Sequence, residues 1–172
     1  MSLDYKSALE IERKYIIEMP DITVLSAQEE YTKSEITQIY LSSEKGETHR
    51  IRRRVFSDRV ELTETRKIRI DEMSVTEIEG QISNSYFEEL AENIEQGTAP
   101  ISKTRHTFIF RDQTFEIDVY PAWSNTAIME TELKNRDEMV QMPPFIRIIK
   151  EVTGNKKYSN AAMSKSFPDE IK

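Results

Sequence analysis

The sequence has 172 residues, a net charge of -7, 37% hydrophobic and 32% charged residues, two histidines and no cysteine. These values predict one folded domain over residues 1–172, exclude disulfides and thiolate metal sites, and disfavour a histidine-rich zinc site. Because no apolar run approaches the roughly 20 residues of a membrane helix and no export signal is recognisable, we expect a cytoplasmic protein without a membrane partner.

Short segments rich in Ile, Val, Thr, Phe and Tyr alternate polar and apolar residues, as β-strands do. The alternation predicts eight strands, at residues 8–17, 35–42, 48–57, 60–68, 75–82, 102–111, 114–120 and 127–135. A helical spacing of apolar residues predicts one helix over 85–95 and a second over 144–152, which starts at Pro144 and stops before Gly154. Residues 21–33 are ambiguous, with a helix favoured over a loop.

Charge is unevenly distributed along the chain. Residues 50–70 hold eight basic and three acidic side chains, whereas residues 71–99 hold eight acidic and no basic ones. The negative total argues against a protein that coats nucleic acid, so no nucleic-acid partner is expected. The segregation indicates a function that uses both signs of charge.

The predicted strands place like charges on one face. Glu10, Glu12 and Lys14 share a face of the first strand, while Leu9, Ile11 and Tyr15 take the other. The same phase groups Arg50, Arg52 and Arg54; Thr63, Thr65 and Lys67; Glu77, Glu79 and Gln81; Lys103, Arg105 and Thr107; Glu116, Asp118 and Tyr120; and Glu130, Glu132 and Lys134. Each set alone fits a solvated sheet face. Together they favour a bound counter-charged ligand, because like charges two residues apart repel each other.

A sheet of eight strands with one charged and one apolar face can close into a barrel. We therefore predict a mainly β (α+β) fold, an eight-stranded antiparallel barrel with a charged tunnel inside and helices packed outside. Carboxylate oxygens suit Mg²⁺ or Mn²⁺, and the basic side chains suit a polyanion. Both histidines, His49 and His106, fall out of phase with the charged pairs, so structural roles are favoured for them and water is the expected nucleophile.

The motifs that these residues form resemble the CYTH family, the triphosphate tunnel metalloenzymes. The family's E-x-E-x-K stands at residues 10–14, R-x-R at 50–52, T-x-K at 65–67, E-x-E at 77–79 and K-x-R at 103–105. Asp118, a last E-x-E at 130–132 and the closing segment 157–160 follow in the family's order. The resemblance covers about residues 9–162. It departs from bacterial relatives at residues 123–127, where these often carry a Gly-Leu pair.

The resemblance implies metal-dependent hydrolysis of a triphosphate inside the tunnel. It implies a metal site for Mg²⁺ or Mn²⁺ formed by Glu10, Glu12, Asp118, Glu130 and Glu132. It implies phosphate binding by Lys14, Arg50, Arg52, Lys67, Lys103 and Arg105, with Glu77 and Glu79 in supporting roles. The catalytic set that it implies is Glu10, Glu12, Lys14, Glu130 and Glu132. A homodimer is an expectation at the level of the family.

The family acts on several triphosphates, and we favour inorganic triphosphate because the short chain shows no platform for an organic group beyond the tunnel. Three alternatives stay open. Two are enzymes, a class IV adenylate cyclase acting on ATP and a thiamine triphosphatase. The third is a polyphosphate- or nucleotide-binding protein without turnover, which the complete carboxylate set disfavours.

Overall fold

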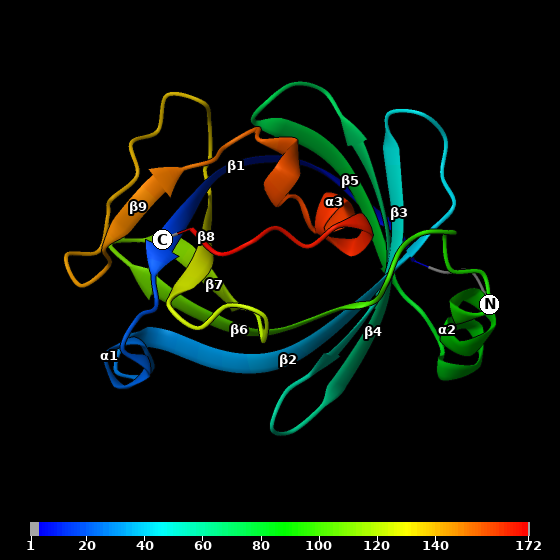
Figure 1. Ribbon diagram of the computed structural model, residues 1–172, viewed down its shortest axis with the longest axis horizontal. Coiled ribbons are helices and arrows are strands. Elements are labelled where there is room, and N and C mark those ends of the chain that lie inside the picture. The colour runs from blue at the N-terminus through cyan, green and yellow to red at the C-terminus, as the bar shows by residue number, and fades with distance from the viewer. Residues whose placement is uncertain (1–3, 172) are drawn as a thin grey trace.

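Eight strands close into an antiparallel barrel in the computed structural model, which describes residues 4–171 (Figure 1). Met1 to Leu3 and Lys172 lie outside the described residues. The strands are β1 (Lys6–Glu18), β2 (Glu29–Leu41), β3 (Glu47–Val55), β4 (Val60–Arg69), β5 (Ser74–Gln81), β6 (Ile101–Phe110), β7 (Gln113–Val119) and β8 (Thr126–Glu132). Their order around the ring is β1, β5, β4, β3, β2, β6, β7, β8, and β8 pairs with β1 again. The predicted closed barrel is confirmed.

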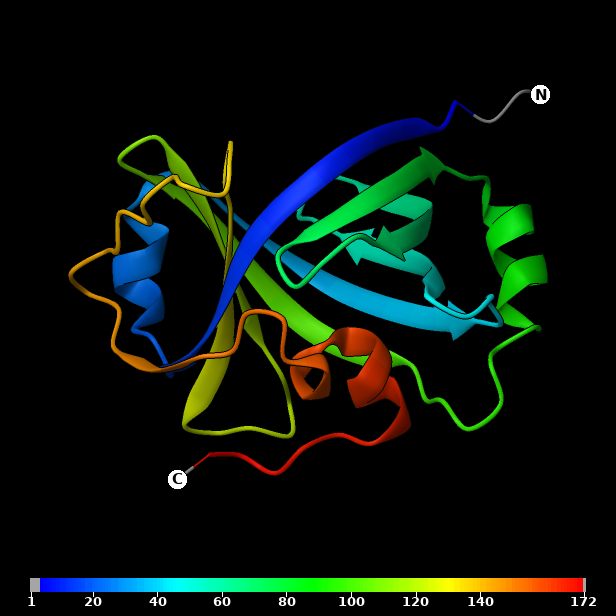
Figure 2. The same cartoon turned by 90° about the horizontal axis from the view of Figure 1, so that it is seen from above.

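Strand β1 closes the ring by changing partners along its length. Its first half pairs with β5, from Lys6 opposite Glu79 to Ile11 opposite Ser74, and its second half pairs with β8 from Glu12 onward. Figure 2 shows β1 crossing the molecule diagonally between these two partners. The change of partner occurs within the E-x-E-x-K motif, so barrel closure itself positions those side chains.

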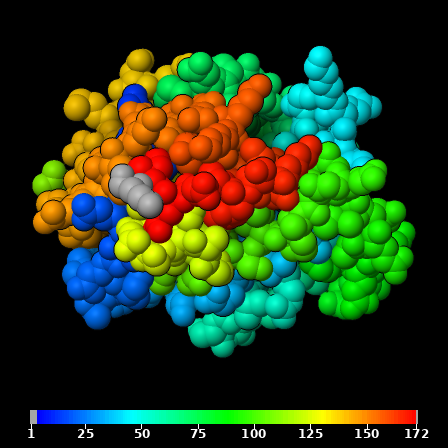
Figure 3. Space-filling view, in the orientation of Figure 1, coloured from blue at the N-terminus to red at the C-terminus, as the bar shows by residue number. Residues whose placement is uncertain are grey.

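Short helices cover the outside and one end of the barrel. They are α1 (Ile22–Ser26), α2 (Asn84–Ala91), the 3₁₀ helix η1 (Lys156–Tyr158) and α3 (Asn160–Lys165). In Figure 1, α3 lies in the middle of the ring of strands, and Figure 3 shows the C-terminal segment across the centre of the same face. Within residues 4–171, no helix is long and apolar enough to cross a membrane.

Two clusters of apolar side chains lie on the outer face of the strands, under the covering segments. Phe108 and Met129 belong to a buried cluster that includes Leu25 of α1, and α2 packs Phe87 and Leu90 against a cluster around Ile51. Because these apolar residues face outward, the alternating polar residues face the interior of the ring.

A third apolar cluster joins the strands to the C-terminal segment. Its members Ile16 and Ile128 are in phase with the cavity residues Lys14 and Glu130, so they face the interior at the end where the C-terminal segment packs.

The predicted helix over 144–152 is wrong. Residues Ile148–Glu151 form a ninth strand, β9, which pairs antiparallel with β1, with Ile16 opposite Lys150. The edge of β1 beyond β5 offers free backbone groups, and pairing with them outweighs a helical spacing that rests on only four apolar residues.

Two other boundaries differ from the prediction. The ambiguous residues 21–33 hold a five-residue helix, capped by Asp21, and then the start of β2, which begins six residues before the predicted position 35. The predicted helix over 85–95 is observed as α2 and ends at Ala91. The short helix α3 after Ser159 was not predicted as a helix.

Gly154 allows the segment after β9 to approach the turn before β5. Its φ is +72°, and a Cβ added there would lie 2.9 Å from Cβ of Glu72 and 3.2 Å from the backbone oxygen of Glu72. We expect Gly154→Ala to lower the free energy of unfolding by about 3 kcal/mol, because it combines backbone strain with a clash against backbone. Urea unfolding measures the change.

Gly97→Ala is the matched control. Gly97 also has a positive φ, +81°, but a Cβ there would meet nothing within 4 Å. Backbone strain alone predicts a loss of about 1 kcal/mol. Equal losses in the two variants would contradict the close approach at Gly154.

Candidate functional site

The barrel encloses a charged cavity of about 710 Å³. All eight barrel strands contribute to its wall, and residues between Lys156 and Lys165 line it from the C-terminal segment. The wall includes most of the residues that the sequence motifs single out: Glu10, Glu12, Lys14, Arg50, Arg52, Lys67, Glu77, Arg105, Glu130 and Glu132. Six separate motifs thus meet at one cavity because successive strands present the same phase to the interior.

Ion pairs connect the basic and acidic groups of the wall. Nζ of Lys14 lies 2.6 Å from Glu130, and Nζ of Lys67 lies 2.7 Å from Glu10 and 2.8 Å from Glu77. Although burial disfavours the charged forms, Glu130 and Glu12 raise the pKa of Lys14, and Lys14 and Arg105 lower the pKa of Glu130 to about 2. Both partners of the Lys14–Glu130 pair are therefore charged at neutral pH.

Lys103 and Asp118 are buried and do not line the cavity. Asp118 accepts hydrogen bonds from Nζ of Lys103 at 2.5 Å and from Nε and Nη2 of Arg105, both at 2.7 Å. Burial opposes the charge of Asp118, but Arg105 and Lys103 hold its pKa well below the ordinary range. Both carboxylate oxygens of Asp118 are thus occupied, and the arrangement fixes the guanidinium of Arg105 against the wall.

Glu79 also contacts the basic groups rather than the open cavity. Its carboxylate accepts from Nη2 of Arg52 at 3.2 Å and from the hydroxyl of Thr65 at 2.7 Å. Glu77 lies 3.9 Å from Arg50 in addition to its contact with Lys67. These two glutamates hold three cationic side chains in place on the cavity wall.

Two arginines of the wall retain unsatisfied donors. The Nε groups of Arg50 and Arg52 are buried and have no hydrogen-bond partner within residues 4–171. Burial and then the charge of Arg50 lower the pKa of Arg52 to about 10. A buried donor without a partner is costly, and an anionic ligand in the cavity would supply the missing acceptor.

Four carboxylates gather where β1, β8 and β7 are adjacent. Glu12 lies opposite Glu132 on β8, and Glu130 lies opposite Glu116 on β7. The charge of Glu130 and then burial raise the pKa of Glu12, while burial and then Glu116 raise that of Glu132. Glu12 and Glu132 thus face like charges, whereas Glu130 pairs with Lys14 and Glu116 pairs with Arg105.

Several solved structures are similar to this barrel. A crystal structure of the inorganic triphosphatase NE1496 matches with a TM-score of 0.57 and 29% identity, over 92% of this chain and 96% of that chain. The PH1819 protein from Pyrococcus horikoshii OT3 matches with a TM-score of 0.56 and 25% identity, over 75% of this chain and 81% of that chain. No protein-family model and no curated protein matches the sequence.

These two proteins are members of the CYTH family of triphosphate tunnel proteins, and this chain shares their fold. The resemblance that its motifs indicate is therefore confirmed in the fold, with a similarity to NE1496 that extends over nearly the whole of both chains.

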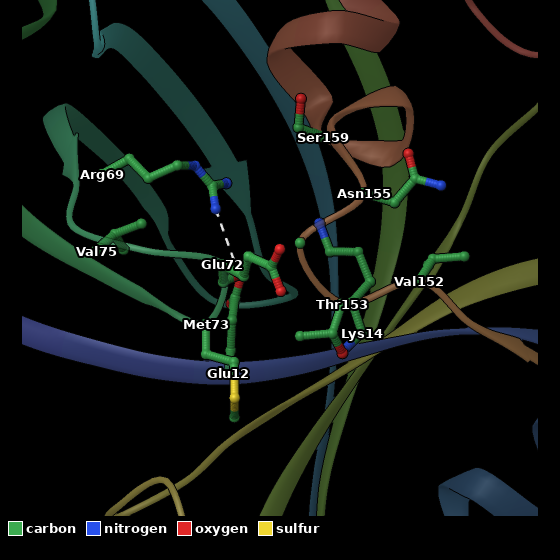
Figure 4. A pocket seen from close by; sticks show the side chains of 11 residues that line it. Glu12, Lys14, Arg69, Glu72, Met73, Val75, Val152, Thr153, Asn155 and Ser159 are labelled. Carbon is green, nitrogen blue, oxygen red and sulfur yellow. Dashed lines mark hydrogen bonds between the residues drawn. The ribbon is translucent and has the colours of Figure 1, made fainter.

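The tunnel has a small side pocket of about 30 Å³ (Figure 4). Glu12 and Lys14 of β1 line both the side pocket and the main cavity. The remaining lining comes from residues 69–75 and from residues 152–159, which meet β1 where it changes partners. The side pocket is large enough for a few water molecules only.

Several residues of the cavity wall lie outside the predicted site: Arg54, Glu116, Lys156, Ser159, Asn160 and Lys165. For Arg54 and Glu116 the signal was available, because the alternation already placed them in phase with Arg52 and Asp118. Ser159 and Asn160 lie in the closing motif. Lys165 had no local signal, since α3 reaches the cavity only through its packing on the barrel.

The histidines are engaged in contacts with other side chains. Nε2 of His49 lies 2.7 Å from a carboxylate oxygen of Glu64, and Nδ1 of His106 lies 2.9 Å from the hydroxyl of Tyr31. All four side chains come from outside the motif set. These contacts fit structural roles for both histidines, and His49 also lines the cavity.

Glu130→Gln tests the pair between Glu130 and Lys14. We expect the variant to lose about 3 kcal/mol or more of stability at pH 7, because removal of one partner leaves a buried charge uncompensated. The pKa of Glu130 is lowered from 4.5 to about 2, so its contribution is present above pH 4.5 and is lost as the pH falls toward 2. The stability difference from the unmodified protein should therefore shrink over that range in urea unfolding with a chelator present.

Glu89→Gln on the exposed face of α2 removes the same charge without touching the cavity. Its stability difference should be small and should stay constant between pH 4.5 and pH 2. A difference for Glu130→Gln that does not change with pH would contradict the ionised pair.

Proposed function

We propose that this protein hydrolyses inorganic triphosphate in the tunnel, with a divalent metal ion. The observation that carries the proposal is the pair of buried, unsatisfied Nε donors of Arg50 and Arg52 on a cavity wall of ion pairs. A linear polyanion would accept from both donors and compete for the other basic groups. The similarity to the inorganic triphosphatase NE1496 supports the choice of substrate.

Five basic side chains on the wall are proposed to bind phosphate oxygens: Lys14, Arg50, Arg52, Lys67 and Arg105. Lys103 contributes indirectly in this proposal, because it holds Asp118, which in turn fixes Arg105. The carboxylates paired with Lys14 and Lys67 keep these cations balanced when no ligand is bound. Binding therefore exchanges carboxylate partners for phosphate partners, and a divalent metal ion would offset part of the negative charge that the substrate adds.

The carboxylates around β1 and β8 fit a divalent metal ion in donor type. Within residues 4–171 no three acidic or histidine side chains already converge as a metal site, but the repulsion that raises the pKa of Glu12 is one that a cation would relieve. Glu12, Glu130 and Glu132 would hold Mg²⁺ or Mn²⁺ through hard oxygen ligands. The ion, when bound, would supply charge for the developing phosphate anions.

The reaction itself needs one water molecule. The water oxygen forms a bond to a terminal phosphorus, and the bond between that phosphorus and the bridging oxygen breaks, so pyrophosphate leaves with the electron pair. The proton of the water passes to a carboxylate of the wall and then to solvent. The task of this chain is to align the substrate and to place cations around the charge that develops.

The first test is phosphate release from inorganic triphosphate, thiamine triphosphate and ATP, each with Mg²⁺, with Mn²⁺ and with chelator. We expect release mainly from inorganic triphosphate, and its loss in chelator. Formation of cyclic AMP and pyrophosphate from ATP would instead identify a cyclase. Tight triphosphate binding with no turnover on any substrate would identify a binding protein.

Arg52→Gln tests phosphate binding by the tunnel arginines. We expect triphosphate affinity to fall roughly 10-fold to 100-fold, the range for loss of a hydrogen bond to a charged group. Isothermal titration calorimetry in chelator measures the dissociation constant without turnover. Arg53→Gln is the matched control, because Arg53 is exposed on the opposite face of the same strand. Equal losses of triphosphate affinity in both variants would show that the affinity depends only on the net charge of the protein and not on the position of Arg52.

A further inference from the structure

Arg54 extends the row of arginines that Arg50 and Arg52 begin on β3. All three line the cavity, and they alternate with residues of the opposite face. Arg50 lies opposite Tyr40 of β2, next to Leu41 at the end covered by α3, whereas Arg54 lies opposite Ile36. Because two residues of a strand advance about 7 Å, Arg54 stands about 7 Å beyond Arg52, away from the covered end.

Arg54 differs from the other arginines of this row in having no carboxylate partner. Arg50 lies 3.9 Å from Glu77 and Arg52 lies 3.2 Å from Glu79. No carboxylate of residues 4–171 lies within 4 Å of the Arg54 guanidinium, although the side chain is half-buried. Burial and then the charge of Arg105 lower the pKa of Arg54, although Glu116, Glu61 and Asp118 act in the opposite direction.

Two contacts hold the Arg54 guanidinium in place. Nε of Arg54 donates to the hydroxyl of Ser34 at 2.9 Å, and Ser34 is fully buried. The guanidinium stacks over the ring of Phe56, with its Cζ 4.6 Å from the ring centroid. Neither contact uses the terminal Nη groups, which donate to no described residue. The side chain is thus oriented with its strongest donors free.

We propose that Arg54 binds a phosphate unit beyond the three held in the Arg50–Arg52 part of the tunnel. The tunnel then takes linear polyphosphates longer than triphosphate, with inorganic tetraphosphate as the shortest chain that gains the contact. Arg52 and Arg54 line the same cavity, so a longer phosphate chain held by Arg52 can also reach Arg54. The inference rests on the proposed function, because it takes the Arg50–Arg52 part as the triphosphate site.

Calorimetry in chelator, with inorganic triphosphate and inorganic tetraphosphate as the two probes, tests the inference. The unmodified protein should bind tetraphosphate more tightly than triphosphate. Arg54→Gln should lose about tenfold in tetraphosphate affinity, the low end for a hydrogen bond to a charged group, and less than about twofold in triphosphate affinity. Phe56→Leu should lose part of the same preference, because it removes the surface that orients Arg54.

Arg53→Gln is again the control for net charge, and it should shift both affinities by the same small factor. The role of Arg54 would be overturned if Arg54→Gln lost equal affinity for triphosphate and tetraphosphate, or if the unmodified protein did not prefer tetraphosphate. Either result would leave the proposed triphosphate site standing. If the unmodified protein bound neither triphosphate nor tetraphosphate, the tunnel site and this inference would both be overturned. Absence of hydrolysis alone would affect only the proposed activity, because the measurement requires no turnover.

Discussion

The charges inside the barrel are the constraint on which the structure depends. Charged groups leave water only at a cost of several kcal/mol each unless a counter-charge accompanies them. The barrel meets this requirement by pairing almost every interior cation with a carboxylate, as in Lys14 with Glu130 and Lys67 with Glu10. The interior is therefore a network of compensated pairs, and a ligand that enters it must exchange partners rather than find free charges.

The closure of the ring makes this network possible. Strand β1 passes from β5 to β8 at Glu12, so that one motif contributes to two neighbouring walls. Lys14 then reaches Glu130, while Glu10 reaches Lys67 of β4 across β5. The same change of partner leaves the small side pocket between β1, the turn before β5 and the segment around Gly154. Fold and candidate site are thus consequences of one crossing strand.

The sequence could predict the barrel because side chains on a strand alternate with a period of two. Once the apolar set is assigned to one side, residues such as Arg50 and Arg52 must share the other. The same alternation could not distinguish a residue that lines the cavity from one buried behind it. Asp118 is in phase with Glu116 but is enclosed by Lys103 and Arg105. Ion pairs between neighbouring strands decide that difference. Pairing between strands also explains why residues 148–151 form β9 on the edge of β1 and not the helix that their apolar spacing predicts.

The three arginines on β3 lack different partners among the described residues of the tunnel. Arg50 and Arg52 have carboxylate partners but keep a buried Nε unsatisfied, so they lack an acceptor rather than a counter-charge. Arg54 has an acceptor for Nε in Ser34 but no described carboxylate within 4 Å of its guanidinium. A phosphate chain supplies both acceptor oxygens and negative charge, and it is extended along one direction as the three arginines are. The row on β3 therefore matches a linear anion better than a compact one, which would satisfy one arginine and leave the next unchanged.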